Sequence, residues 1–321
     1  MLYVGIDVSK ATLAVCVLGE SKQQREFGNN RKGHYQLLSW LKKQADAVAI
    51  VGLEATGSYG EAVCTYLYEQ GVSVSVINPA RIKAYAQSQL KRHKTDAIDA
   101  ELIADFCRTQ QPEPWSPPPP EELELRALVR HLDDLKAQRQ AEKNRLEAQP
   151  GSKTVVRNLQ AHIRFLDGQI QQLEHDIHDH MNQHPHLKQQ HDLLKSIPGI
   201  GDITSFQILA ELGDLTRFSD VRQVVALAGL NPQQRRSGTS LHYTAGISRM
   251  GHDSLRAALF MPAMVAMRYN PILKAFAERM QRNGLKPKQV ITAVMRKLLH
   301  LAYGVLKNKE PFNPNYLALC S

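Results

Sequence analysis

The fold is decided by the stretch Leu2-Tyr3-Val4-Gly5-Ile6-Asp7, a short apolar run that ends in an aspartate. An apolar run of this length, bounded by turn residues, predicts a buried β-strand. A second run of the same kind covers residues 47–54 and ends in Glu54. Because a buried strand has no structural use for an unpaired charge, the acid that ends each run indicates a functional group.

Two further acids, Asp96 and Asp99, begin a helix predicted over residues 96–107. Their spacing of three residues places both carboxylates on one helix face. Two strand acids and two helix acids together form a set of hard oxygen ligands that suits Mg²⁺ or Mn²⁺. A pair of such ions held ~3.5–4 Å apart drives in-line phosphoryl transfer. Each acid alone has a structural explanation, since Glu54 can end a strand and Asp96 can cap the helix behind Thr95. The four together favour a metal site.

Polar and basic residues flank these acids. Ser9 and Thr56 each follow a strand acid by two residues, and they are either partners of the metal ligands or ordinary turn residues. The run Lys91-Arg92-His93-Lys94 precedes the helix acids. It fits phosphates that pass over an acidic pocket, and it fits a solvated loop equally well.

Strands and helices alternate before residue 111. Strands are expected over residues 3–7, 12–18, 25–27, 48–54 and 72–77, and helices over residues 33–44, 59–70 and 96–107. The order strand-strand-strand-helix-strand-helix-strand-helix is that of a ribonuclease H-like, or RuvC-like, domain. The predicted fold of residues 1–111 is therefore α/β.

A proline-rich linker separates this domain from an all-α remainder. Residues 112–120 hold six prolines around Trp115, which predicts a stiff extended segment. Apolar residues at 3-4 spacing then predict two long helices within residues 121–186, as a coiled-coil hairpin or a dimerisation arm. Residues 187–321 are expected to be mostly helical. Their helix signals cover residues 192–195, 203–212, 221–228, 254–267, 271–283 and 288–307.

The composition indicates a basic protein that binds a polyanion. The 321-residue chain has a formal net charge of +9, although its predicted metal site is acidic, so nucleic acid is the expected partner. The four cysteines are scattered, and the histidines crowded into residues 175–191 lack zinc-ligand spacing and are expected at a solvated helix end. Without a signal peptide or a long apolar stretch, the chain is expected in the cytoplasm, with no membrane partner.

The segment Ser196-Ile197-Pro198-Gly199-Ile200-Gly201 joins two predicted helices and is typical of a helix-hairpin-helix element. Its glycines, Gly199 and Gly201, would let the backbone approach a phosphate, and the next helix offers unpaired N–H groups. The alternative is a simple packing corner between helices.

A second polar segment, Arg235-Arg236-Ser237-Gly238-Thr239-Ser240, is expected to be a loop. Such a loop could place a serine oxygen near a phosphodiester while Arg235 and Arg236 hold the phosphate oxygens. On residue types alone, however, a loop rich in Ser, Thr and Gly is usually only a loop.

Together these motifs resemble the DEDD-type transposases of bacterial insertion sequences, the bridge-RNA-guided recombinases. The resemblance covers essentially the whole chain in the family's order. It rests on residues 5–10, 54–57, 78–79, 94–100, 197–201, 228–232, 237–240, 251–252 and 255–256.

The resemblance implies a RuvC-like domain, a coiled-coil middle and a C-terminal transposase domain. The four acids Asp7, Glu54, Asp96 and Asp99 would bind divalent metal, and Ser240 would attack DNA to form a covalent phosphoserine link. Ser237 and Thr239 stay open as alternatives to Ser240. A structured non-coding bridge RNA would pair with donor and target DNA. The active site would be composite between subunits of a homo-oligomer, a dimer or a tetramer, in the bacterial cytosol or nucleoid.

Two other functions compete with this one. A RuvC-like, structure-specific nuclease shares the acids and only hydrolyses DNA, so it needs neither Ser240 nor a long helical domain. A kinase or ATPase of the actin type is faintly suggested by Gly5-Ile6-Asp7-Val8-Ser9. That class would require a second glycine-rich phosphate loop, which the sequence lacks, and it would not explain the basic charge.

Overall fold

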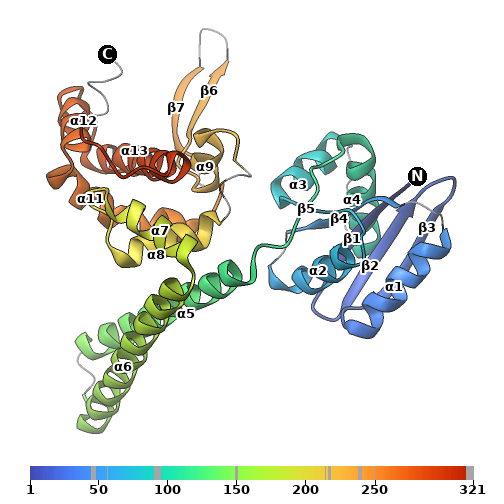
Figure 1. Ribbon diagram of the computed structural model, residues 1–321, viewed down its shortest axis with the longest axis horizontal. Coiled ribbons are helices and arrows are strands. Elements are labelled where there is room, and N and C mark those ends of the chain that lie inside the picture. The colour runs from blue at the N-terminus through green and yellow to red at the C-terminus, as the bar shows by residue number, and fades with distance from the viewer. Residues whose placement is uncertain are drawn as a thin grey trace. The chain divides into compact units, whose positions relative to one another are not determined.

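The computed structural model of the chain separates into two compact units, Met1–Pro117 and Pro118–Ser321 (Figure 1). It describes residues 1–44, 48–55, 57–89, 95–148, 151–213, 215, 218–237, 241–248 and 250–315; at residues 58, 233–237 and 241–245 it describes the backbone alone. Each unit has its own hydrophobic core. Among these residues, no helix combines the length and apolarity needed to cross a bilayer.

Unit 1, Met1–Pro117, is built on a five-stranded mixed sheet. Its strands are β1 (Leu2–Val8), β2 (Thr12–Leu18), β3 (Lys22–Gly28), β4 (Val48–Glu54) and β5 (Val74–Ile77). They lie in the order β3-β2-β1-β4-β5. Strand β2 runs antiparallel to β1 and β3, whereas β4 and β5 run parallel to β1. This order and these directions are those of a ribonuclease H-like fold, which confirms the fold predicted for the N-terminal domain.

Helices cover both faces of this sheet (Figure 1). They are α1 (Arg31–Gln44), the 3₁₀ turn η1 (Ser58–Gly60), α2 (Glu61–Glu69), α3 (Pro79–Ser88) and α4 (Asp96–Gln110). One face packs on α1 and α2 through side chains that include Ile6, Leu37 and Val63. The opposite face packs on α3 and α4 through clusters that include Ile82 and Ala104. Alternating side chains along each strand thus supply two cores.

Two glycines let α4 approach the sheet closely. A Cβ atom added at Gly5 would lie 2.1 Å from the carbonyl oxygen of Ala100 and 2.3 Å from the backbone nitrogen of Ala104. A Cβ atom added at Gly52 would lie 2.2 Å from the sulfur of Cys107. Because neither strand position has room for a side chain beneath α4, the helix is held directly against β1 and β4.

The proline-rich segment begins by covering the edge of the sheet. The backbone N–H of Trp115 donates to the carbonyl of Val74 in β5 over 2.6 Å. The indole ring of Trp115 also meets the ring of Tyr68 edge-on. An open edge strand offers unpaired backbone groups to other chains, and this contact occupies part of that edge.

Unit 2, Pro118–Ser321, is mainly helical. Its helices are α5 (Pro120–Glu147), α6 (Lys153–Gln183), α7 (Pro185–Lys195), α8 (Asp202–Leu212), α9 (Val221–Leu227), α10 (Asp253–Ala258), α11 (Phe260–Tyr269), α12 (Pro271–Arg282) and α13 (Pro287–Asn308). Between α9 and α10 the chain forms a two-stranded antiparallel sheet, β6 (Pro232–Ser237) and β7 (Leu241–Ile247). One continuous core runs from Leu125 in α5 to Leu306 in α13.

Helices α5 and α6 pack as an antiparallel pair within the chain. Lys136 pairs with Glu174 and Arg139 with Asp167, so the partner's number on α6 falls as the number on α5 rises. Buried side chains at 3-4 spacing fill the seam, namely Leu125, Val129, Leu132, Leu135, Leu166, Ile170, Leu173 and Ile177. The expected boundary at residue 186 stays a prediction, because the seam and the C-terminal helices share one core.

The β6–β7 hairpin corrects the expectation of a loop over residues 235–240. Arg235, Arg236 and Ser237 lie in β6, and the predicted all-α domain therefore contains a small sheet. The sequence hides this hairpin because β6 reads Pro-Gln-Gln-Arg-Arg-Ser, with no apolar residue in alternation. A two-stranded sheet does not need a strand that is apolar on one face throughout its length.

Two predicted helices begin or divide at other positions. The helix expected over residues 254–267 is two helices, because Pro262 has no N–H to donate to the carbonyl of Ala258. The first of the two ends at Ala258 and the second begins at Phe260. The helix expected over residues 59–70 starts with a 3₁₀ turn and becomes α-helical at Glu61.

Candidate catalytic site

Asp7 and Glu54 lie on neighbouring strands at the same end of the sheet. Asp7 is the penultimate residue of β1, and Glu54 is the last residue of β4. The strands pair in parallel with Ile6 opposite Leu53, so the two acids come next in register. Both acids belong to the face covered by α4, since the glycine two residues earlier in each strand contacts that helix.

The helix acids come to the same end because α4 runs antiparallel to β1. On β3, Lys22 pairs with Glu101 at 3.0 Å, and Gln24 donates to the carbonyl of Ala97 at 3.0 Å. Strands β3 and β1 run in the same direction, so the step from Lys22 to Gln24 is a step along β1 toward Asp7. Over the same step the partner on α4 changes from Glu101 to Ala97, which lies nearer the first turn of the helix. The fold thus brings both helix acids to the level of Asp7.

Thr95 caps α4 and leaves both acids in its first turn. The Thr95 hydroxyl accepts a hydrogen bond from the N–H of Ile98 at 3.3 Å, so Asp96 is the first helical residue and not the cap. Asp96 is exposed and Asp99 is half-buried. The unpaired N–H groups of a helix N-terminus favour negative charge at this place.

The four acids fit a divalent cation in their chemistry, and they lie toward one end of the sheet. Carboxylates are the hard ligands that Mg²⁺ prefers, and a bound cation relieves their mutual repulsion. Within the described ranges, however, no group of three or more His, Cys, Asp and Glu side chains gathers closely enough to hold a metal ion. The metal site therefore stays a prediction, supported by where the acids lie and not by a formed cluster of ligands.

Asn29, which sequence analysis missed, joins the turns that follow both strand acids. Its Nδ2 donates to the carbonyls of Ser9 at 2.9 Å and Tyr59 at 3.0 Å, and its Oδ1 lies 3.0 Å from Nε2 of His34. Since two carbonyls orient the amide, His34 carries its proton on Nε2. Burial lowers the pKa of His34 below 6.5, which keeps the ring neutral. Ser9 is itself a turn residue, because its hydroxyl donates to the carbonyl of Thr12 at 3.0 Å. The one signal in the sequence is an asparagine directly after a strand.

The loop between α7 and α8, which contains Gly199 and Gly201, packs against α11 at Gly199. A Cβ atom added at Gly199, whose φ is +111°, would lie 2.7 Å from Cβ of Ala266 in α11. Its close approach therefore serves helix packing on this side of the loop. Gly201 is exposed, with no atom within 4 Å of an added Cβ. Phosphate binding in this loop stays a prediction at both Gly199 and Gly201.

A buried polar cluster ties α7 to α8 beside this loop. His191 Nδ1 lies 2.9 Å from the hydroxyl of Ser205, and its Nε2 lies 3.2 Å from the carboxylate of Asp202. Lys195 lies 2.6 Å from the same carboxylate and lowers its pKa. Burial lowers the pKa of His191, whose exposed fraction is 7%. This histidine is therefore not at the solvated helix end that its histidine-rich segment predicted.

The predicted nucleophile belongs to the β6–β7 segment. Ser237 is the last residue of β6 and pairs with Leu241, the first of β7. Ser240 lies outside the described residues, and the structure describes only the backbone of Arg235 and Arg236. Other predicted residues outside the described ranges are Thr56, Lys91, Arg92, Lys94 and Thr239. The structure therefore gives no distance from Ser240 to the acids.

Partly buried polar contacts fix the chain on both sides of this hairpin. Ser248, just after β7, donates to the side chain of Asn231, just before β6, over 2.5 Å. Further on, Glu211 accepts a hydrogen bond from Ser254 at 3.0 Å and lies 2.5 Å from Nδ1 of His252. Burial would raise the pKa of Glu211, but the bonds from His252 and Ser254 outweigh it and leave the pKa lowered. The ribbon is thus anchored where it joins the helical core.

Comparison with known proteins supplies the family. A family model described as Transposase matches residues 4–149, and one described as Transposase IS116/IS110/IS902 family matches residues 191–278. The pilin gene-inverting protein of Moraxella bovis is 36% identical over 316 residues, which cover 97% of each chain. This chain belongs to the IS116/IS110/IS902 family of transposases.

Membership in the IS116/IS110/IS902 family confirms the family that the motifs resemble. The transposase of element IS1111A from Coxiella burnetii is 23% identical, over 96% of this chain and 90% of that protein. The structure of RuvC from Thermus thermophilus matches 36% of this chain and 100% of its own length, with 16% identity and a TM-score of 0.27. The two family models together span the four acids, the glycine loop and the β6–β7 hairpin.

Proposed function

We propose that this transposase is a recombinase of an insertion sequence, which cuts and rejoins donor and target DNA with four carboxylates and a serine. The observation that carries the proposal is the common position of Asp7 and Glu54 at one sheet end, with α4 running back to bring Asp96 and Asp99 to it. A sheet packed on both faces holds such groups within narrow limits, as catalysis requires.

We assign the four acids to binding of Mg²⁺ or Mn²⁺. When bound, such an ion polarises a phosphoryl oxygen and stabilises the charge that develops on a leaving oxygen. The protein's part is to hold the carboxylates: the register of β1 and β4 sets Asp7 beside Glu54, and the glycine contacts set α4. Because the carboxylates repel one another, their convergence and the binding of the cation are coupled.

Ser240 is the proposed nucleophile. Its Oγ forms a bond to a DNA phosphorus while the bond from that phosphorus to one strand oxygen breaks, and the serine proton is transferred to the released strand oxygen. The number of phosphoester bonds is unchanged, so another strand hydroxyl can reverse the step and rejoin DNA without ATP. Arg235 and Arg236 would hold the phosphate oxygens. Ser237 and Thr239 stay the alternative nucleophiles.

Rejoining is favoured over hydrolysis by the name of a near relative. The Moraxella bovis protein, 36% identical over almost its whole length, is named for inverting a pilin gene. Inversion requires that the cut strands be joined again, which a hydrolase does not do. A RuvC-like nuclease is the alternative function, and it would release DNA ends without attached protein.

A structured non-coding bridge RNA is the proposed guide, and a homo-oligomer is the proposed assembly. The net charge of +9 suits binding of both RNA and DNA. The four acids and Ser240 belong to different units of the chain. In the family that the motifs resemble, these groups come together from different subunits of a dimer or tetramer.

The experiment that tests the chemistry traps the covalent intermediate. Purified protein would be mixed with Mg²⁺ and labelled DNA from the ends of its own element, quenched with denaturant, and mapped by mass spectrometry. Wild type is expected to carry DNA on Ser240. Asp7→Asn and Ser240→Ala are expected to form no adduct while their DNA affinity changes less than about twofold, since neither removes a basic side chain.

Each other outcome revises a separate part of the proposal. Metal-dependent cleavage with no adduct from wild type would establish hydrolysis in place of recombination. An adduct on Ser237 or Thr239 would keep the mechanism and move the nucleophile. Full cleavage in EDTA, or by Asp7→Asn, would contradict the metal site.

Guidance by RNA has its own test. RNA that copurifies with the protein would be sequenced and compared in affinity with random RNA of equal length. The specific RNA is expected to bind more tightly, and both affinities should fall steeply as salt rises. Equal affinities would contradict guidance, and an affinity that does not change with salt would contradict binding through phosphates.

A further inference from the structure

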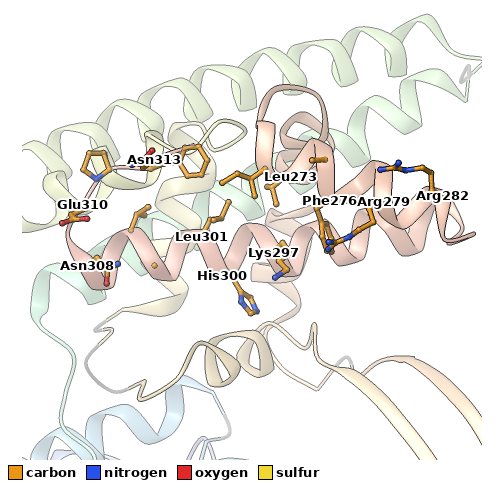
Figure 2. Close-up of a pocket in the computed structure, with 16 residues that line it drawn as sticks. Leu273, Phe276, Arg279, Arg282, Lys297, His300, Leu301, Asn308, Glu310 and Asn313 are labelled. Atoms are coloured by element: carbon orange, nitrogen blue, oxygen red, sulfur yellow. The ribbon is translucent and has the colours of Figure 1, made fainter. Parts of the chain in front are cut away.

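A cavity of about 800 Å³ lies between α12, α13 and the chain just after α13 (Figure 2). Its floor is apolar and includes Leu273 of α12, Leu301 and Val305 of α13, and Phe312. The N–H of Phe312 donates to the hydroxyl of Ser196 over 2.8 Å, which holds the segment after α13 against the helical core. The volume lies within the ~300–1,000 Å³ typical of ligand sites.

One end of the cavity carries three cations, Arg279 and Arg282 from α12 and Lys297 from α13 (Figure 2). Within the described part of the chain, none of them forms an ion pair with a carboxylate. The guanidinium carbon of Arg279 lies 5.5 Å from the centre of the Phe276 ring, and the Lys297 nitrogen lies 5.8 Å from it. Two positive charges are thus gathered over an aromatic ring.

The opposite end of the cavity is polar. Asn308, Glu310 and Asn313 lie there, away from the arginines (Figure 2). Along α13 the distance from Lys297 to Asn308 is about 16 Å at ~1.5 Å per residue. The cavity is therefore elongated, with a cationic end, an apolar floor and an amide-bearing end.

We propose that this cavity binds an unpaired nucleotide of a single strand. A nucleotide joins an anionic phosphate to a flat apolar base with hydrogen-bonding edges, and these parts match the three zones of the cavity. The three cations take the phosphate, the ring of Phe276 contacts the base, and Asn308 and Asn313 meet the base edge. A duplex does not fit, because its bases are stacked on one another and cannot enter a recessed floor.

The inference rests on the proposed function in taking nucleic acid as the partner, but the cavity has no part in cleavage. Its lining residues, from Ile272 to Asn313, follow the proposed nucleophile in the sequence and are not among the proposed catalytic groups. Binding of a single strand and formation of the serine adduct can therefore be measured and lost independently.

The test measures binding by the full-length protein of single-stranded DNA, single-stranded RNA and the matched duplex, each containing 2-aminopurine. Phe276→Leu keeps an apolar side chain and removes the ring. It is expected to weaken single-strand binding about tenfold and to abolish the 2-aminopurine signal of stacking, with duplex affinity changed less than about twofold. Lys297→Gln is expected to reduce the salt dependence of single-strand binding by about 0.7 in slope.

Lys274→Gln is the matched control, because Lys274 is an exposed lysine of α12 that does not line the cavity. Equal losses of single-strand affinity in Lys274→Gln and Lys297→Gln would show that the lysines act only through general electrostatic attraction, and would overturn the site. Unchanged affinity and stacking in Phe276→Leu would also overturn it. If thermal melting shows that Phe276→Leu is unfolded, the double variant Arg279→Gln with Lys297→Gln tests the same prediction.

Comparing the affinities for RNA and for DNA shows which kind of single strand the cavity binds. Stronger binding of RNA supports the site for an unpaired base of a guide, and stronger binding of DNA supports it for a displaced strand. If wild type forms the serine adduct but binds no single strand in the cavity, only the proposed binding site is rejected. Intact cavity binding without any adduct would reject the proposed chemistry alone.

Discussion

The two regions proposed to carry the chemistry are built in opposite ways. Strand β1, which carries Asp7, pairs with β2 on one side and β4 on the other and lies directly beneath α4. Strand β6, which leads toward Ser240, pairs with β7 alone in a two-stranded sheet. A two-stranded ribbon is marginally stable by itself, whereas a central strand with a covered face is among the last elements to open.

This difference divides two tasks between the two units. Unit 1 holds its acids to a position set by strand register and by helix packing. In the sequence of unit 2, the proposed nucleophile Ser240 falls between the two strands of a narrow ribbon, which is anchored near Asn231 and Ser248. On the proposed function, firmly held metal ligands and a nucleophile next to a narrow ribbon suit a reaction in which DNA strands must be approached, released and exchanged.

The largest effect is expected from a single methyl group beneath α4. Gly5→Ala would place Cβ 2.1 Å from the Ala100 carbonyl oxygen, and overpacking of this kind is expected to destabilise unit 1 by about 3 kcal/mol. Urea unfolding followed by tryptophan fluorescence measures this, because both tryptophans, Trp40 and Trp115, belong to unit 1.

Gly246→Ala in β7 is the matched control, since among the described atoms none beyond its chain neighbours lies within 4 Å of its added Cβ. Its effect on stability, followed by helical circular dichroism, is expected to stay below ~0.5 kcal/mol. Comparable losses in the two variants would contradict the contrast between a packed strand and an open ribbon.

A smaller chemical change tests how rigidly the sheet of unit 1 holds its acids. Asp7→Glu keeps the charge and moves the carboxylate outward by one methylene, so cleavage is expected to fall about 100-fold. Glu20→Asp, at an exposed acid after β2, makes the reverse change outside the site and should leave the rate unchanged. Cleavage by Asp7→Glu at the wild-type rate would show that the acids are not held in a fixed geometry.

The Asn29 contacts predict a moderate loss of activity. Asn29→Ala removes the side-chain donor to the carbonyls of Ser9 and Tyr59 and is expected to lower cleavage about tenfold through kcat, with ~1–2 kcal/mol of lost stability. Asn30→Ala removes a hydrogen bond to the N–H of Gly33 at 3.0 Å and serves as the control. It should lower stability by about 1 kcal/mol without changing kcat in the folded protein. Equal kcat losses would reduce Asn29 to a purely structural role.

The smallest effect is a pH dependence of stability in unit 1. Because burial lowers the pKa of His34 below its ordinary 6.5, the unfolded chain takes up a proton first as the pH falls. The contribution of neutral His34 is therefore fully present well above pH 6.5 and is lost progressively as the pH falls below it. Tryptophan-monitored urea unfolding should show this slope in wild type and a flatter one in His34→Asn. Stability that rises on acidification would contradict the neutral His34–Asn29 pair.

Much of unit 1 could be predicted from local sequence. Strand β4 is found at Val48–Glu54, where an apolar run between turn residues predicted it, and the parallel and antiparallel directions follow from the element order. The placement of the strand acids follows from that order as well, because parallel strands end at one edge of a sheet. These features depend on periodicity, which a single sequence displays.

Features that depend on distant contacts could not be predicted. Asn29 acts through two turns that lie 20 and 30 residues away in the chain. A glycine such as Gly199 lets its backbone come close to another group, but the sequence does not show which group. Only the structure shows that Ala266 of another helix lies there. His191 is polar in sequence, and its burial beside Ser205 requires knowledge of how α7 meets α8.

The order of strands in unit 1 also has a consequence for the synthesis of the chain. Strands β1, β2 and β3 leave the ribosome first, but the helix that covers Gly5 and Cys16 ends only at Gln110. At ~5–20 residues/s that helix follows β3 by roughly 4–16 s, during which one face of the three-stranded meander has no cover. Uncovered strands associate readily with other chains. Codons that slow translation between β3 and α4 are therefore expected to lower the yield of folded protein without changing any residue.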